Sequence, residues 1–172
     1  NYSSWEMDSL AMYYHEHELT KVNLRHHDIK DFGELPSNPV VEKTFKRNGI
    51  EIPIFKLDRI AGTVIAKDDA HSSFSLLTVR DGVVTVKVSR DYFARINRRI
   101  SEVQEDGTKK VRETGWLQKG TRLIVQGIRR GDMFIAKRYA KSKYHQVYKI
   151  TNIAENGFIE STHLRYGETD DE

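Results

Sequence analysis

"SSFSLLTVRDGVVTVKVSRDYFARINRRI" (residues 72–100) contains two strand-like runs, a turn and a basic helical pattern in immediate succession. The runs, 72–80 and 83–88, are rich in β-branched and apolar residues, and the Asp81-Gly82 pair between them is typical of a tight hairpin turn. Ser89 is a suitable N-cap for a helix over 89–100, in which three apolar residues recur at helical spacing. These residues are Phe93, Ile96 and Ile100. The stretch therefore predicts a β-hairpin that leads directly into a helix.

Further strand-like runs flank this stretch on both sides. They are rich in β-branched or aromatic residues, and turn-forming pairs such as Gly131-Asp132 separate them. They cover residues 59–67, 122–130, 133–140 and 143–153. Gly62 lies within the first run, where a glycine commonly marks a bend or a close approach of two backbones. Three strands, a helix and two strands are the order of an OB-fold, a five-stranded, partly open barrel.

The basic residues are concentrated in the middle of the chain. Residues 1–44 carry eight acids and four bases, and residues 155–172 carry six acids and one base. The remaining 23 bases and 11 acids give residues 45–154 a formal charge of +12. Net charge is informative about association rather than fold, and a basic barrel fits an acidic partner such as nucleic acid. The alternative interpretation is a solvated basic surface without a partner.

The amino-terminal residues are predicted to form a helix and a connector. Ser3 and Glu6 match a capping box, and apolar residues spaced along one helical face follow, with the helix ending near Leu19. We predict a mainly β protein with flanking α structure, in which an N-terminal helical segment precedes a five-stranded OB-fold barrel. The predicted units are a helical lead-in and connector over 1–44, an OB-fold nucleic-acid-binding domain over 45–154 with a polar insertion at 101–115, and an acidic tail over 155–172.

Residue patterns that carry covalent or metal chemistry do not occur in the chain. It contains no cysteine, no phosphate-binding glycine-rich loop and no nucleophile elbow. His15 and His17 would point away from each other on a helix, and the His26-His27 pair lacks a zinc-binding spacing. We therefore expect no catalytic residue, no metal site and no cofactor. No run approaches the roughly 18 apolar residues of a membrane span, so we expect no membrane partner.

Candidate nucleic-acid contacts follow from the predicted barrel. OB-folds bind along the face of their second and third strands and with two loops, one after the first strand and one after the fourth. Single-strand binders combine cations with aromatic rings on which bases stack. The candidates are Lys67, His71, Phe74, Lys87, Arg129, Arg130, Lys137, Arg138, Tyr139, Lys141, Lys143 and Tyr144. Among the aromatic residues, Phe74 fits a core position better, and Tyr139 and Tyr144 are the better stacking candidates.

Residues 5–19, "WEMDSLAMYYHEHEL", resemble the E-x-x-x-L-G-F-Y-x-x-x-H-P-L segment of the alpha subunit of bacterial DNA polymerase III, a C-family replicative polymerase. That segment leads into the C-terminal region of the family. The matching residues are Glu6, Leu10, Tyr13 or Tyr14, His17 and Leu19. Ala11 stands where the family has glycine, and Glu18 stands where it has proline.

Residues 60–93 are similar to the OB-fold domain of the same family. The positions that match its strand and hairpin patterns are Phe74, Leu77, Asp81, Gly82, Val86, Val88 and Tyr92. The resemblance covers about residues 5–150 of this chain. It implies a non-catalytic module that holds the single-stranded template, because the metal-binding aspartates of the family lie in an upstream palm domain that this chain does not contain.

The resemblance also implies partners and a location. The expected partners are single-stranded DNA, the rest of the alpha chain of a bacterial or phage polymerase and, in addition, other replisome proteins. The expected location is the cytoplasm, in association with the nucleoid. Two alternatives stay open: a stand-alone RNA-binding OB-fold module of the anticodon-binding type, and a protein-interaction domain of the replisome.

Overall fold

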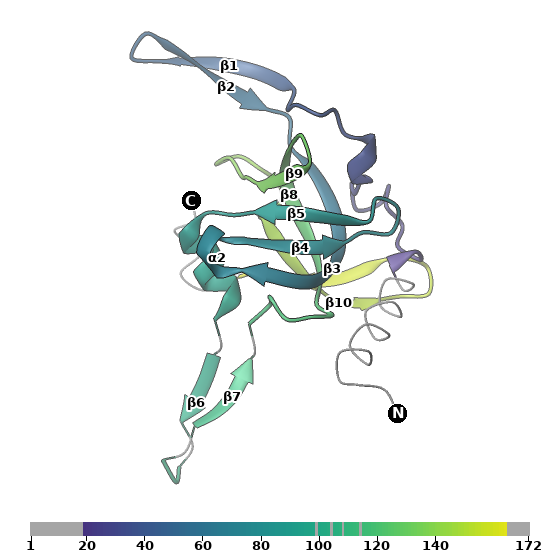
Figure 1. The fold of residues 1–172 in the computed structure, drawn as a ribbon, viewed down its shortest axis with the longest axis vertical. Coiled ribbons are helices and arrows are strands. Elements are labelled where there is room, and N and C mark those ends of the chain that lie inside the picture. The colour runs from purple at the N-terminus through teal and green to yellow at the C-terminus, as the bar shows by residue number, and fades with distance from the viewer. Residues whose placement is uncertain (1–18, 99, 104, 108, 114, 165–172) are drawn as a thin grey trace.

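The computed structural model describes residues 19–98, 100–103, 105–107, 109–113 and 115–164 of the chain (Figure 1). The predicted amino-terminal helix lies outside these residues except at Leu19, whose side chain is buried. Residues 165–172 of the predicted acidic tail also lie outside them. Within the described residues, no helix is long and apolar enough to cross a membrane.

Five strands close into a barrel with the connectivity of an OB-fold, as predicted. They are β3 (Asp58–Asp68), β4 (Ser73–Leu77), β5 (Val83–Lys87), β8 (Arg122–Arg130) and β9 (Met133–Ala136). Strand β3 pairs with β4 and β8, β4 pairs with β5, and β9 closes the ring by pairing parallel to β5 and antiparallel to β8. Helix α2 (Arg90–Asn97) lies between β5 and β8 in the sequence.

The predicted hairpin and helix cap are both present. Strand β4 meets β5 in the register that places Leu77 opposite Val83, and the turn closes through an N–H of Thr78 that donates to the carbonyl of Gly82 at 2.8 Å. The Ser89 hydroxyl accepts from the N–H of Tyr92 at 3.2 Å and caps α2. The helix ends at Asn97, three residues earlier than predicted, because β6 already begins at Ile100.

The barrel interior is filled by apolar side chains from every barrel strand. Phe74 is 1% exposed and packs among residues such as Leu76, Val86 and Phe134. This burial makes Phe74 a core residue, so its candidacy as a base-contacting residue is withdrawn. Gly62 of β3 serves the predicted close approach, because a Cβ there would lie 2.9 Å from the Cβ of Leu76.

Two additional hairpins project from opposite ends of the barrel in Figure 1. Strands β1 (Val41–Arg47) and β2 (Ile50–Phe55) form the first, which we call the arm. Its Asn48-Gly49 turn has φ values of 53° and 79°, as the favoured two-residue hairpin turn requires. The predicted boundary between residues 44 and 45 falls inside β1. The second hairpin, β6 (Ile100–Val103) and β7 (Lys109–Glu113), lies in the predicted polar insertion.

The barrel sheet extends beyond β8 through two further strands. Strand β10 (Val147–Ile153) pairs with β8, and β11 (Ile159–Thr162) pairs with β10. The prediction that residues 155–172 form a tail is therefore wrong for β11, which belongs to the sheet. The strands predicted over 133–140 and 143–153 are shorter than expected, because residues 137–146 form a loop between β9 and β10.

The connector packs on the barrel. It contains a short 3-10 turn, η1 (Phe32–Glu34), and a second such turn, η2 (Asp69–His71), lies between β3 and β4. Leu19, Val22 and Ile29 of the connector form a second apolar cluster with Ile124 of β8 and Ile150 of β10. This cluster fixes the connector against the outer side of the extended sheet.

Candidate nucleic-acid interface

A groove of about 800 Å³ lies between the arm and the loop over residues 137–146. We call it the arm–loop groove. It combines aromatic, cationic and apolar side chains from segments far apart in the sequence. Its lining residues are Glu42, Lys43, Thr44, Phe45, Ile54, Phe55, Leu57, Gln126, Tyr139, Ala140, Lys141, Ser142, Lys143 and Tyr144. It therefore holds four of the twelve candidate residues, namely Tyr139, Lys141, Lys143 and Tyr144.

The loop side of the groove is positioned by Gln126, a buried polar residue in the middle of β8. Gln126 is 5% exposed, and its side-chain amide donates to the carbonyls of Lys137 at 3.3 Å and Tyr144 at 3.2 Å. The Arg138 guanidinium donates to the same Tyr144 carbonyl at 3.1 Å. Buried polar groups of this kind must be paired, so these bonds specify one loop conformation.

The tyrosine at the start of the loop connects the loop to the arm. The N–H of Phe55 in β2 donates to the Tyr139 hydroxyl at 3.0 Å. Lys137 places its ammonium 5.5 Å from the centroid of the Tyr139 ring, and Ser142 exchanges hydrogen bonds with Tyr139 at 3.0 Å. The ring of Tyr139 is thus held at the junction of the two walls.

Cations border the groove on both sides. Lys43 comes from the arm, and Lys141 and Lys143 are exposed residues of the loop. Arg130, at the end of β8, is exposed and places its guanidinium 5.6 Å from the ring centroid of Phe55. Glu42 is the one acidic side chain among the described residues that line the groove. The resulting excess of positive charge suits a phosphate backbone.

Tyr144 packs into a cluster that joins the loop, the barrel and the connector. Its hydroxyl donates to the Asp28 carboxylate at 2.6 Å, and this bond holds the pKa of Asp28 below its usual value. The Arg59 guanidinium lies 3.7 Å from the centroid of the Tyr144 ring and also donates to the carbonyl of His27. Burial lowers the pKa of Arg59. The guanidinium of Arg59 thus lies against one face of the Tyr144 ring and joins Tyr144 to the barrel.

Arg129 is used to hold the connector rather than to face the groove. Its guanidinium donates to the carbonyls of Phe32 and Leu35, each at 3.0 Å, and of Gly131 at 2.8 Å. It also lies 4.3 Å from the centroid of the Phe32 ring. These bonds use the Nε and Nη1 groups, and a guanidinium has five N–H donors, so the Nη2 group keeps two donors for another acceptor. Arg129 therefore holds the connector, and its candidacy as a nucleic-acid contact stays a prediction.

Three other candidates lie away from the groove. Lys67 donates to the side chain of Asn97 in α2 at 2.7 Å. The His71 imidazole contacts the Asp68 carboxylate at 2.8 Å, and this contact lowers the pKa of Asp68. Lys87 is exposed at the end of β5. None of these three side chains is among the described residues that line the groove.

The histidines of the connector take part in packing. His26 stacks on Phe158 with ring centroids 4.0 Å apart, and the ring of His27 accepts the N–H of Ile159 at 2.9 Å. Burial lowers the pKa of His27. Over the described part of the chain, no group of three or more histidine, aspartate and glutamate side chains is arranged to hold a metal ion.

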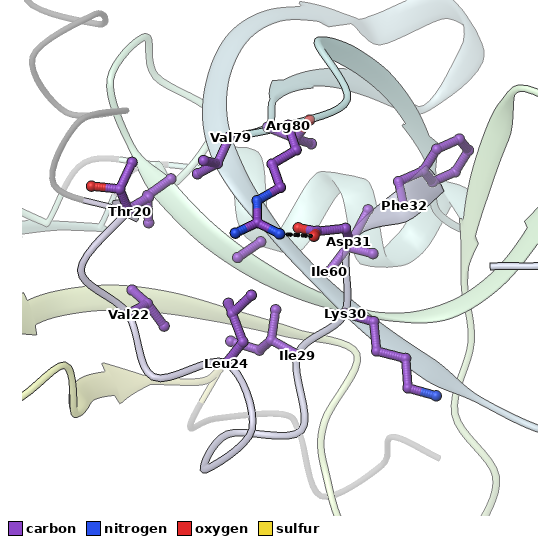
Figure 2. Close-up of a pocket in the computed structure, with 13 residues that line it drawn as sticks. Thr20, Val22, Leu24, Ile29, Lys30, Asp31, Phe32, Ile60, Val79 and Arg80 are labelled. Carbon is purple, nitrogen blue, oxygen red and sulfur yellow. Dashed lines mark hydrogen bonds and ion pairs between the residues drawn. The ribbon is translucent and has the colours of Figure 1, made fainter. Parts of the chain in front are cut away.

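A second cavity, of about 320 Å³, lies where the connector meets the barrel (Figure 2). Its lining is mostly apolar, and the Arg80 guanidinium reaches across to the Asp31 carboxylate at 3.2 Å. Burial raises the pKa of Asp31 although Arg80 opposes this effect. The cavity lies between the two apolar clusters, and its lining includes one aromatic residue, Phe32, and two cations, Lys30 and Arg80.

Sequence reasoning missed the arm side of the interface. Lys43, Phe45 and Phe55 lie in residues assigned to the connector or left without a role. The available signal was the Asn48-Gly49 pair between alternating apolar residues, which is typical of a hairpin. Gln126 was also missed, although a glutamine inside the apolar run of 122–130 indicates a buried polar group with specific partners.

Two curated proteins are similar to the chain over most of its length. They are "Probable DNA polymerase YorL" of Bacillus subtilis (strain 168) and "DNA-directed DNA polymerase" of Bacillus phage SPbeta. Each is 41% identical over 162 residues, which is 94% of this chain. The chain spans 12% of the length of these curated relatives. No family model matches the chain, and no solved structure matches it.

Proposed function

We propose that this chain is a module of a DNA polymerase that binds single-stranded template DNA and has no catalytic activity of its own. Similarity to two DNA polymerases supports a role in DNA replication, and the small share of their length supports a module rather than a whole enzyme. The resemblance of residues 5–19 and 60–93 favours a polymerase of the DNA polymerase III alpha-subunit type. The observation that carries the proposal is the arm–loop groove on an OB-fold barrel.

Aromatic rings in the groove supply stacking surfaces. Phe45 is 44% exposed although it is a large apolar residue, and it lies across the groove from the loop that carries Tyr139. Stacking of a base on an aromatic ring contributes about 1–3 kcal/mol and accepts every base, because each base has a π-face. The groove therefore binds single strands with little sequence preference, and a paired duplex does not offer it free base faces.

Lysines in the groove supply phosphate contacts. Lys43 on one wall and Lys141 and Lys143 on the other place positive charge along both sides of a strand that lies between them. Each phosphate that a lysine neutralises releases a counterion, so affinity falls as salt rises. Arg130, on the ring of Phe55, adds a cation at the same border.

The catalytic chemistry of the parent resides elsewhere under this proposal. The partners of the module are the single-stranded template and the rest of the polymerase chain, together with other replisome proteins. The isolated chain shows no nucleotide incorporation and no nuclease activity with magnesium or manganese. Incorporation that co-purifies with the chain and disappears on a point substitution within it would contradict the proposal.

The test is a fluorescence anisotropy titration of single-stranded DNA with wild-type chain and Phe45→Ala. Loss of a stacked base weakens binding by about 5- to 150-fold, which corresponds to about 1–3 kcal/mol, with an unchanged dependence on salt. Val83→Ala is the matched control, because Val83 is also a large exposed apolar residue, 56% exposed, but belongs to β5 outside the groove. Equal affinities for wild type and Phe45→Ala would contradict the proposed site.

Competition with other polymers separates this proposal from the two alternatives. Under the proposal, an unlabelled single-stranded DNA displaces the probe better than a duplex or an RNA of the same sequence does. Better displacement by RNA indicates an RNA-binding module, because the 2′-hydroxyl is the group that distinguishes the two polymers. Absence of nucleic-acid binding together with salt-resistant binding to a replisome protein indicates a protein-interaction domain.

A further inference from the structure

A smaller basic pocket of about 270 Å³ lies where the start of β8 meets β10. We call it the β8–β10 pocket. Its lining residues are Lys119, Gly120, Thr121, Arg122, Lys149 and Ile150. Three of these carry a positive charge, one carries a hydroxyl, and none of the described lining residues is acidic. The pocket shares no residue with the arm–loop groove.

The backbone that carries these cations is fixed by the barrel. The turn before β8 closes through an N–H of Thr121 that donates to the carbonyl of Gln118 at 3.1 Å. Two bonds to Val64 of β3 hold the turn, one from the N–H of Gly120 at 2.9 Å and one to the carbonyl of Thr121 at 2.8 Å. Lys149 lies in β10 between two paired neighbours, opposite Leu123 of β8 and Thr162 of β11.

Three basic side chains line this one pocket, and an anion bound among them is attracted by each. A guanidinium and two ammonium groups are the usual partners of phosphate oxygens, the guanidinium as a fork and the ammonium groups as point charges. The Thr121 hydroxyl adds a neutral donor to the set. A carboxylate ligand would need fewer charges than this arrangement provides.

We infer that the β8–β10 pocket binds a phosphate group. Its position differs from the usual OB-fold binding surface, which uses the second and third strands and the loops after the first and fourth. The phosphate has two sources, a backbone phosphate of bound nucleic acid or free phosphate and pyrophosphate. The nucleic-acid source rests on the proposed function, whereas the phosphate chemistry of the pocket does not.

A nucleic-acid strand must be long enough to reach the pocket from the groove. Arg122 and Arg130 begin and end β8, and at about 3.4 Å per residue they lie about 27 Å apart along this β-strand. A nucleic-acid strand that occupies both the groove and the pocket therefore crosses the barrel. Short oligonucleotides fill the groove alone, whereas longer ones reach the pocket as well.

The experiment compares two pairs of lysine substitutions with equal loss of charge. Lys119→Ala with Lys149→Ala removes two cations of the pocket, and Lys141→Ala with Lys143→Ala removes two cations of the groove. Isothermal titration with inorganic phosphate and with pyrophosphate is done at constant ionic strength in chloride, after melting temperatures have shown that both variants fold. Wild-type chain and the groove pair bind pyrophosphate equally, and the pocket pair binds it at least ten-fold more weakly.

A salt titration with a short and a long single-stranded DNA identifies the source. If a phosphate of the DNA backbone occupies the pocket, the variant with Lys119→Ala and Lys149→Ala has a log–log salt slope flatter by about 1.4 for the long oligonucleotide. Its slope for the short oligonucleotide is unchanged. If this variant loses pyrophosphate binding but keeps the wild-type salt slopes for both oligonucleotides, the ligand of the pocket is free phosphate or pyrophosphate. No saturable phosphate binding, or an equal loss in both pairs, overturns the inference. If the wild-type chain binds pyrophosphate but does not bind single-stranded DNA, the result contradicts the proposed function and leaves the phosphate pocket standing.

Discussion

A single buried glutamine organises the loop side of the arm–loop groove. The amide of Gln126 satisfies two loop carbonyls from the middle of an otherwise apolar strand, while Arg138 reaches one of them from the loop itself. This arrangement holds residues 137–146 in a loop outside the sheet, where strands were predicted over 133–140 and 143–153. Hydrogen bonds between residues distant in the sequence determine the backbone of this loop, and no local pattern reports them.

Replacing Gln126 by methionine keeps the volume of the side chain and removes its donors. The carbonyl of Lys137 then loses its side-chain partner, so we expect the free energy of unfolding to fall by about 1–3 kcal/mol. The loop loosens as well, and affinity for single-stranded DNA falls. Urea unfolding and the anisotropy titration measure the two effects. Gln118→Met, at an exposed position, leaves both quantities unchanged, and equal behaviour of the two variants would refute this role for Gln126.

His27 gives the fold a dependence on pH. Its ring accepts the N–H of Ile159 only when that nitrogen is unprotonated, and burial lowers the pKa of His27 below 6.5. Between the folded-state pKa and 6.5, the unfolded chain binds a proton that the folded chain does not. The contribution of His27 is therefore fully present above about pH 6.5 and decreases as the pH falls below it.

Melting temperatures between pH 7.5 and pH 5.5 test this dependence. His27→Gln, which cannot be protonated, should show a smaller loss of melting temperature over this range than wild type. His71→Gln is the control, because its partner Asp68 lies on the surface away from the connector, and it should not flatten the profile. A profile for His27→Gln as steep as that of wild type would assign the pH dependence to other groups.

The elements of the barrel were predictable because their signals are local. The Asp81-Gly82 pair, the β-branched runs on each side of it and the Ser89 cap lie within one short stretch, and the hairpin and the cap form as predicted. The turn is longer than predicted, because β4 ends at Leu77 and the connection covers residues 78–82. The arm carries an equally local signal at Asn48-Gly49, but its residues are exposed throughout β1 and contribute no core. Because the arm has no buried face, the alternation of apolar and polar residues in its sequence does not distinguish a projecting hairpin from an irregular connector.

Phe74 tests the barrel assignment at the level of its hairpin. It is a fully buried ring of β4 in the same apolar cluster as Phe93 of α2 and Phe134 of β9, so Phe74→Ala should lower the free energy of unfolding by about 3–5 kcal/mol. Phe74→Leu refills most of the space and should retain single-stranded DNA affinity. Urea unfolding and anisotropy on the two variants provide the measurement. A leucine variant that keeps its stability but loses binding would instead make Phe74 a contact residue.

At the scale of the whole molecule, the order of strands and the charge distribution indicated a basic OB-fold barrel, and the barrel is present. The arm–loop groove was only half predictable. Its loop wall carries a visible cluster of tyrosines and lysines, whereas its arm wall comes from residues 42–57, more than 80 positions earlier. The tertiary fold brings the two walls together, and the N–H of Phe55 donates a hydrogen bond to the Tyr139 hydroxyl at 3.0 Å. Sequence alone also could not show that Arg129 is occupied by the connector.

The central claim is that the arm–loop groove, rather than the usual OB-fold face, binds the single strand. The most direct measurement is the salt dependence of single-stranded DNA affinity, with a short oligonucleotide, for two pairs of lysine substitutions. Lys141→Ala with Lys143→Ala should flatten the log–log slope by about 1.4, because two phosphate contacts are lost. Lys67→Ala with Lys87→Ala removes the same charge outside the groove and should leave the slope unchanged. A flattened slope for the Lys67 and Lys87 pair, with no change for the groove pair, would contradict the account.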